Sequence, residues 1–182
     1  MRILGVDPGT LFTGFAVIEC TPNTIRILKC DVIKNSSRNS LPLRLKNIYD
    51  VLVDVIEEYL PDEFAIETAY YGKNVQSTLK LGHARGVSIL AAVNKQIPTA
   101  EYSPREVKKS VVGIGSASKE QVRYMVNSML KAKVAAGSLD ISDAIAVAVC
   151  HYNKLNKFTS GGSKWEDYVK KNPKKVKIQS FK

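Results

Sequence analysis

The order of hydrophobic patterns along the chain constrains its fold most. Three stretches rich in apolar and β-branched residues come first and predict adjacent strands, at 2–6, 13–20 and 24–33. Helical and strand-like stretches then alternate: helices are predicted at about 41–60, 74–94, 118–133 and 139–155, a short helix from Pro104, and strands at 64–67 and 97–102. Strands first, then helices and strands in alternation, indicate an α/β domain with a mixed sheet flanked by helices.

The charge distribution separates this domain from the end of the chain. The 182 residues contain 27 lysines and arginines against 17 aspartates and glutamates, and residues 157–182 hold eight of the lysines. That segment contains a glycine- and serine-rich stretch at 159–163, a composition typical of flexible linkers. We therefore expect one folded domain at 1–156, close to the usual domain size, and a basic, flexible tail at 157–182.

The net charge of +10 predicts an anionic partner, and nucleic acid fits better than an acidic membrane surface. The longest apolar run, 144–150, has seven residues, whereas about 20 are needed to cross a bilayer. The amino terminus reaches Asp7 before a signal-peptide core could develop. We expect a cytoplasmic protein without a membrane segment, whose three well-separated cysteines stay reduced.

Four acidic residues occupy positions that suit a ligand site. Asp7 and Glu67 end predicted strands, and Asp140 and Asp143 lie three residues apart at the start of a helix. Alone, each is better explained by a turn or by a helix cap, which stabilises by about 0.3 to 1 kcal/mol. If they converge, two carboxylates about 4 Å apart repel by about 4 kcal/mol at an effective dielectric near 20, which capping cannot offset. A divalent cation can, and this set of oxygen ligands favours Mg²⁺ or Mn²⁺ acting on phosphate.

Five short motifs follow one another along the chain: GVDPGT at 5–10, FAIE at 64–67, LKLGHARG at 79–86, VKKSVVGIG at 107–115 and DISDA at 140–144. Together they closely resemble the RuvC family of crossover junction endodeoxyribonucleases, over about residues 1–153. The resemblance implies a ribonuclease-H-like fold in which Asp7, Glu67, Asp140 and Asp143 line one metal-binding cleft. It also implies a homodimer, with the helix at about 74–94 in the interface, and cooperation with the RuvA and RuvB branch-migration proteins.

The same resemblance implies the substrate and the chemistry. The family cuts four-way Holliday junctions by paired nicks in two strands of like polarity, leaving a 5′ phosphate and a 3′ hydroxyl. Two Mg²⁺ ions, with Mn²⁺ as a substitute, would act on the phosphodiester. By resemblance, Asp7 binds both ions, and Glu67, Asp140 and Asp143 complete their coordination. Some family members have histidine at the position of Asp143, so this residue follows only part of the family's pattern.

Three further residues are expected to contact DNA. By resemblance, Tyr70 stacks on unpaired bases at the crossover, at a position where the family usually has phenylalanine. Lys108 and Lys119 match family lysines that contact DNA near the scissile phosphate. Without the resemblance, Tyr70 is explained equally well as a half-buried ring, and exposed lysines more often interact only with solvent.

Three other functions stay open. A ribonuclease-H-like nuclease acting on RNA or on RNA–DNA hybrids would carry similar acids, and a non-catalytic junction-binding protein would use the basic surface alone. The Asp-Pro-Gly-Thr sequence at 7–10 also resembles the phosphate loop of sugar kinases and actin-like ATPases. Those enzymes close two lobes around a nucleotide, and a single domain of about 150 residues supplies only one.

Overall fold

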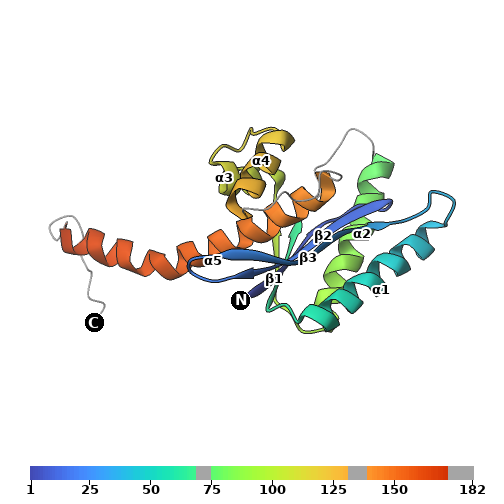
Figure 1. The fold of residues 1–182 in the computed structure, drawn as a ribbon, viewed down its shortest axis with the longest axis horizontal. Coiled ribbons are helices and arrows are strands. Elements are labelled where there is room, and N and C mark those ends of the chain that lie inside the picture. Colours follow the sequence, from blue (N-terminus) through green and yellow to red (C-terminus); the bar gives the residue numbers. More distant parts are fainter. Residues whose placement is uncertain (69–74, 131–138, 172–182) are drawn as a thin grey trace, which may run out of the picture.

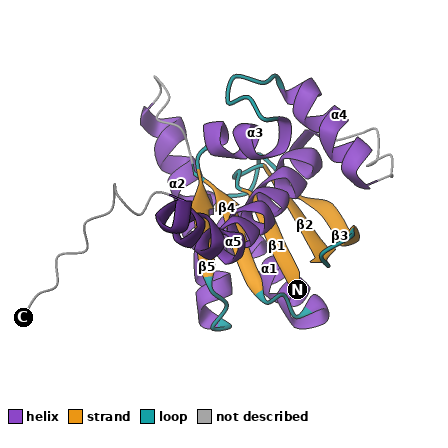
Figure 2. Cartoon of the chain, turned by 90° about the vertical axis from the view of Figure 1, so that its left-hand side faces the viewer, coloured by secondary structure: helices purple, strands orange, loops and turns teal. Residues whose placement is uncertain are grey.

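A five-stranded sheet forms the centre of the molecule (Figure 1). Its strands follow the order β3-β2-β1-β4-β5, as labelled in Figure 2. The structure is a computed structural model that describes residues 1–68, 75–130 and 139–171, without the side chains of 157–171. β1 (Arg2–Asp7), β2 (Phe12–Cys20) and β3 (Ile25–Lys34) form an antiparallel meander, and β4 (Glu63–Glu67) and β5 (Thr99–Tyr102) run parallel to β1. The predicted mixed sheet with three adjacent opening strands is confirmed.

Helices cover both faces of the sheet. α1 (Leu41–Tyr59) and α2 (Val75–Asn94) pack on one face, and α3 (Pro104–Val112), α4 (Lys119–Leu130) and α5 (Leu139–Lys171) lie on the other (Figure 2). Alternate residues of a strand point to opposite faces. In β1, Leu4 and Val6 therefore join the core beneath α1 and α2, and Ile3 joins the core beneath α5.

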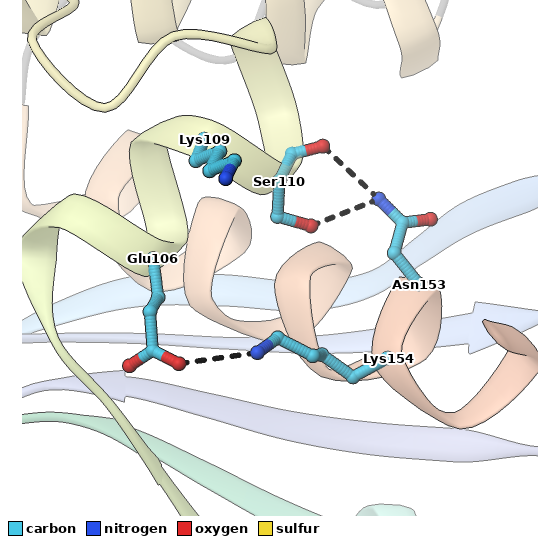
Figure 3. A pocket seen from close by; sticks show the side chains of 5 residues that line it. All are labelled: Glu106, Lys109, Ser110, Asn153 and Lys154. Carbon is cyan, nitrogen blue, oxygen red and sulfur yellow. Dashed lines mark hydrogen bonds and ion pairs between the residues drawn. The ribbon is translucent and has the colours of Figure 1, made fainter. Parts of the chain in front are cut away.

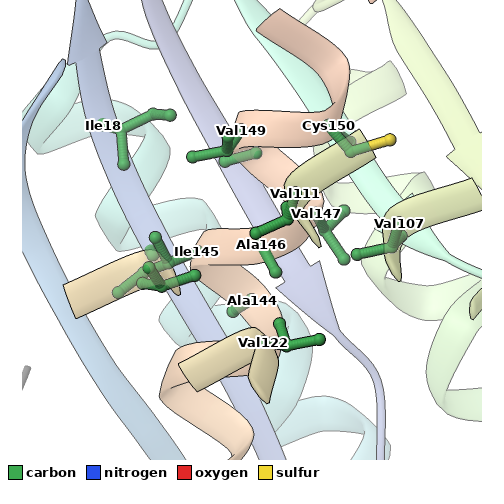
Figure 4. Close-up of a cluster of buried hydrophobic side chains, with 14 of the residues drawn as sticks. Ile18, Val107, Val111, Val122, Ala144, Ile145, Ala146, Val147, Val149 and Cys150 are labelled. Carbon is green, nitrogen blue, oxygen red and sulfur yellow. The ribbon is translucent and has the colours of Figure 1, made fainter. Parts of the chain in front are cut away.

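α5 is the central helix of the second face. Figure 4 shows its apolar residues between the sheet on one side and Val107, Val111 and Val122 of α3 and α4 on the other. Gly5 of β1 faces this helix, and a Cβ atom there would lie 2.3 Å from the carbonyl oxygen of Ala144. The missing side chain lets α5 approach the sheet closely. Buried α5 residues in this core are Ile141, Ala144, Ile145, Ala146, Val147, Ala148, Val149 and Cys150.

The end of α5 differs from the sequence-based expectation. The stretch at 159–163 predicted a flexible linker after a helix ending near residue 155, but the structure continues the helix to Lys171 (Figure 1). Glycine in a helix costs about 1 kcal/mol relative to alanine, and a helix that is already nucleated can propagate through such residues. The predicted end of the helix near residue 155 is therefore wrong, whereas the flexible tail at 157–182 and the division at residue 156 stay predictions.

The three cysteines are free, as predicted. Cys20 and Cys150 are buried and Cys30 is partly buried. Burial raises the pKa of the Cys20 thiol to about 12, so this side chain stays protonated and behaves as a small apolar group. Within the described ranges, the structure has no helix with the length and apolar character needed to span a bilayer.

Candidate active site

Strand alternation places Asp7 and Glu67 on the same face of the sheet. Ile3 of β1 and Ala65 of β4 both belong to the core beneath α5. Asp7 and Glu67 follow them at even spacing, so both carboxylates lie on the α5 side, at the carboxyl ends of two neighbouring parallel strands. Open α/β sheets place their ligand sites at this edge.

α5 brings Asp140 and Asp143 to the same edge. The helix begins at Leu139, so both aspartates lie in its first turns. Gly14 of β2 pairs with Asp7, and a Cβ atom at Gly14 would lie 2.2 Å from the carbonyl oxygen of Asp140. The start of α5 therefore lies against the end of β1, next to Asp7.

The acids are close enough to perturb one another. Burial, followed by the charges of Glu67 and Asp143, raises the pKa of Asp7 to about 8, and Asp140 adds to this rise. Burial and the charge of Asp143 also raise the pKa of Glu67 to about 7. These shifts show negative charge gathered in a poorly solvated place, without enough positive charge beside it.

Two lysines, Lys108 and Lys119, lie beside the acids. Lys119 Nζ donates to Asp143 Oδ2 over 2.5 Å, and its charge partly offsets the rise in the pKa of Asp7. Lys108 lines the same pocket as Lys119, with a volume of about 160 Å³. The other residues of its wall are Glu67, Pro104, Val107, Val122 and Asp143.

Helix caps position these lysines. α3 begins with a capping box between Ser103 and Glu106, which places Lys108 in its second turn. A capping box is also present at the start of α4: Ser118 N donates to Gln121 Oε1 over 2.9 Å, and Gln121 N donates to Ser118 Oγ over 3.3 Å. Lys119 is the first residue of α4, where its side chain reaches the acids.

The donor set suits a hard divalent cation. The four acids offer only oxygen ligands, which Mg²⁺ and Mn²⁺ prefer. Across residues 1–68, 75–130 and 139–156, however, no three histidine, cysteine or acidic side chains already form a group that could hold an ion. Lys119 holds the carboxylate of Asp143, and the remaining acids repel one another. In their chemistry the residues fit a metal site, and their carboxylates would have to turn toward a common ion to hold it.

Sequence reasoning missed part of this site. The ion pair between Lys119 and Asp143 joins residues 24 positions apart, and no sequence signal indicates that two helix starts meet there. The apolar part of the pocket wall, formed by Pro104, Val107 and Val122, was also not predicted. Tyr70 lies outside the described residues, so its contact with bases stays a prediction.

A larger cavity, of about 360 Å³, lies between α3 and α5 and is lined by residues other than the four acids. In Figure 3, Lys154 of α5 donates to Glu106 of α3 over 3.1 Å, and the Asn153 amide donates to Ser110. These contacts fasten α3 to the middle of α5. These contacts hold together two helices that carry residues of the candidate site, but their own residues do not belong to that site.

A mixed sheet with helices on both faces and acids gathered at one edge defines a ribonuclease-H-like nuclease. The family model described as crossover junction endodeoxyribonuclease RuvC matches residues 3–151. The chain belongs to the RuvC family, and it is therefore a metal-dependent endonuclease. The predictions of a ribonuclease-H-like fold and of a crossover junction endodeoxyribonuclease are confirmed.

Relatives and solved structures agree with this assignment. A crossover junction endodeoxyribonuclease RuvC of Salinibacter ruber is 44% identical, over 97% of this chain and 99% of the relative. One of Cytophaga hutchinsonii is 43% identical, over 96% of this chain and 88% of the relative. The structure of Thermus thermophilus RuvC in complex with a Holliday junction substrate superposes with a TM-score of 0.82 at 29% identity, covering 87% of this chain and 97% of that one.

Proposed function

We propose that this enzyme resolves four-way DNA junctions by hydrolysis at the acidic site, with Asp7, Glu67, Asp140 and Asp143 as metal ligands. The observation that carries the proposal is the meeting of two strand ends and one helix start at a single sheet edge, where the pKa of Asp7 rises to about 8. The relative of known structure that binds a Holliday junction supports the choice of substrate.

The residues have separate tasks in this mechanism. When bound, two Mg²⁺ ions, with Mn²⁺ as a substitute, would polarise the scissile phosphate and lower the pKa of an attacking water. Asp7, central among the acids, would be shared between the two ions, and the other three acids would complete the coordination. Lys108 and Lys119 would bind phosphate oxygens from the pocket beside the acids. The products would keep a 5′ phosphate and a 3′ hydroxyl.

We also propose a homodimer formed through α2. One side of this helix carries large apolar side chains that are at least half exposed. Gly82 and Gly86 lie in the same row, and a Cβ atom at either would meet nothing within 4 Å. A row of this kind allows another helix to approach closely, and a two-fold dimer would supply two sites for paired symmetric nicks. The exposed residues of this α2 stripe are Val75, Leu79, Leu90 and Val93.

The substrate proposal is tested by offering a four-way DNA junction, a linear duplex and an RNA–DNA hybrid, each with Mg²⁺, with Mn²⁺ and with a chelator. We expect paired nicks in the junction alone, and none with the chelator. Equal cutting of the hybrid would indicate a nuclease directed at RNA. Junction binding without cutting under any condition would indicate a non-catalytic binding protein.

The remaining proposals rest on family membership and on charge. Tyr70 is proposed to stack on unpaired bases, RuvA and RuvB to be partners at the junction, and the cytoplasm to be the location. Co-sedimentation with RuvA and RuvB on junction DNA tests the partners. The tail at 157–182 is proposed as a basic DNA arm, because it holds eight lysines and two acids. Deleting it should flatten the salt dependence of duplex binding, and an unchanged slope would exclude this role.

A further inference from the structure

A buried chain of hydrogen bonds crosses the molecule behind the candidate site. The Tyr102 hydroxyl lies 2.7 Å from His151 Nδ1, and His151 Nε2 lies 3.3 Å from Glu63 Oε2. Tyr102 and His151 are 9% and 3% exposed, in a core that is otherwise largely apolar. Polar side chains in such a place are costly unless they are paired, so each bond of this chain has a defined partner.

The direction of the bonds follows from the donors available. An ionised Glu63 only accepts, so His151 Nε2 carries the proton and donates to it. His151 Nδ1 is then the acceptor for the Tyr102 hydroxyl. Burial raises the pKa of Tyr102 to about 12 and lowers the pKa of His151, so the hydroxyl keeps its proton and the imidazole is neutral.

Tyr102 is the residue of β5 that lies beside Glu67. The two residues are register partners in the parallel pair of β4 and β5. The Tyr102 carbonyl oxygen also accepts a hydrogen bond from the backbone N–H of Thr68 over 2.8 Å. The backbone of Tyr102 therefore holds the chain directly after Glu67.

At its other end the bond chain reaches Glu63, which belongs to the same strand as Glu67, β4. Glu63 begins β4 and Glu67 ends it, and the two lie on one face because they are four residues apart. His151, on α5, bonds toward both ends of β4, through Tyr102 at one end and directly to Glu63 at the other. Asp143 lies eight residues before His151 on the same helix, which corresponds to about 12 Å along its axis.

Lys154 of α5 connects α3 to the same bond chain, next to the Tyr102 ring. Lys154 Nζ lies 5.8 Å from the centre of the Tyr102 ring. The same ammonium donates to Glu106 of α3 (Figure 3). Apolar packing is not directional and permits small slides of a helix along a sheet, whereas hydrogen bonds fix distance and angle. The bond chain thus adds a directional constraint, beside the core packing, on how β4 and α5 lie relative to each other.

We propose that Tyr102 and His151 are positioning residues that set the separation of Glu67 on β4 from Asp143 on α5, and through it the metal affinity of the acidic site. The proposal rests on the metal-binding role proposed above for these acids. It goes beyond that role because neither Tyr102 nor His151 is among the proposed metal ligands or phosphate contacts. Loss of the Tyr102 hydroxyl should make the separation of Glu67 and Asp143 less well defined, without changing the number or charge of the acids.

The test compares two matched substitutions, Tyr102→Phe and Tyr152→Phe. Tyr152, also on α5, donates its hydroxyl to the carbonyl oxygen of Thr21 over 2.6 Å, at the turn between β2 and β3. Each change removes one hydroxyl and one hydrogen bond of an α5 contact, but only Tyr102 connects to β4. Mn²⁺ binding is measured by titration calorimetry without DNA, and unfolding is followed in EDTA to verify that both variants fold.

We expect Tyr102→Phe to raise the Mn²⁺ dissociation constant about fivefold, below the loss typical for residues bonded directly to metal ligands, and Tyr152→Phe to leave it within about twofold. The nicking rate at saturating junction should fall with Tyr102→Phe and recover at high Mn²⁺, with the junction dissociation constant unchanged. An Mn²⁺ affinity equal to that of wild type would overturn the proposal.

Two controls keep the outcome interpretable. If Tyr102→Phe does not fold, Glu63→Ala breaks the bond chain at its more exposed end, and it should also weaken Mn²⁺ binding; unchanged affinity in that variant would overturn the proposal. If the acids do not bind metal at all, wild type and Asp7→Asn should bind Mn²⁺ with the same affinity. That result would reject the proposed metal site and is distinct from rejection of the positioning role. Wild-type binding that is lost in Asp7→Asn but unaffected in Tyr102→Phe rejects only the positioning role.

Discussion

Lys119 Nζ lies 2.5 Å from Asp143 Oδ2, in an ion pair that joins the first residue of α4 to the first turns of α5. The Asp143 side chain is only 13% exposed, so the ammonium neutralises a carboxylate that water reaches poorly. Burial alone would lower the pKa of Lys119, but the hydrogen bond and the charge of Asp143 raise it above its ordinary value. If Asp143 is a metal ligand, as proposed above, the lysine and the metal ion compete for its carboxylate.

Replacing Lys119 by methionine should expose this competition. Removing a positive charge next to the acids should tighten Mg²⁺ binding about tenfold in the absence of DNA, because the ion no longer meets a competing cation. Junction cutting should fall in the same variant, since a proposed phosphate contact is lost. Titration calorimetry and a nicking assay measure the two effects.

Lys46→Met is the matched control for that experiment. Lys46 forms an ion pair with Asp50 on α1, on the opposite face of the sheet. The Lys46→Met substitution should change neither the Mg²⁺ affinity nor the rate of junction cutting. Weaker Mg²⁺ binding in Lys119→Met than in wild type would show that the lysine assists the metal and does not compete with it.

Stability of the metal-free protein should fall as the pH rises from 5 to 8. The pKa of Asp7 is raised from 3.8 to about 8 and that of Glu67 from 4.5 to about 7. Over this window the folded state binds more protons than the unfolded state, and each such proton lowers the free energy of unfolding by about 1.4 kcal/mol per pH unit. Mg²⁺ should restore stability at pH 8, because it binds the ionised acids.

Melting temperatures in EDTA check this dependence, with Asp7→Asn as the reference. The lowered pKa of His151 acts in the opposite direction near and below its ordinary value of 6.5, and subtracting the Asp7→Asn curve removes that contribution. The variant should be more stable than wild type at pH 8 and less different from it at pH 5. A difference independent of pH would contradict the raised pKa of Asp7.

Asp7→Asn should abolish junction cutting while leaving junction affinity within about twofold, because the basic side chains that attract phosphate are untouched. Asp54→Asn, at an exposed position on α1, is the control and should cut normally. Nicking rates and binding in Ca²⁺ or EDTA separate the two steps. Cutting retained in Asp7→Asn would exclude this residue as a metal ligand.

Local patterns predicted much of the fold and of the acidic site. Strand alternation from Ile3 to Asp7 and a short buried strand ending at Glu67 required only the period of a β-strand. The helix predicted at about 118–133 corresponds to α4. These features depend on residues close together in the sequence, where spacing alone determines the geometry.

Contacts between distant residues could not be predicted in this way. His151 meets Glu63 across 88 positions, and Tyr102 meets His151 across 49. Such pairs depend on how α5 lies on the sheet, which is set by close approaches at glycines and by core packing as a whole. The extension of α5 to Lys171 was missed for a different reason, since helix propagation overrode a composition typical of linkers.

Gly14→Ala should displace the start of α5. The new Cβ would lie 2.2 Å from the carbonyl oxygen of Asp140, a backbone atom that can move only with the helix. We expect a loss of about 1 to 3 kcal/mol in the free energy of unfolding, and slower nicking because Asp140 shifts relative to Asp7. Denaturant unfolding and single-turnover nicking measure both. Wild-type values for both would show that α5 is not held closely at this point.

Leu90→Glu should convert the proposed dimer into a monomer. Leu90 lies in the α2 stripe and is 50% exposed in the single chain, so a glutamate is tolerated there by the fold but not in an apolar helix contact. Leu43→Glu, on α1, changes a leucine of similar exposure, 57%, outside the stripe and should leave the dimer intact. Analytical ultracentrifugation gives the masses. A wild-type protein that sediments as a monomer at micromolar concentration, or a dimeric Leu90→Glu variant, would exclude α2 as the interface.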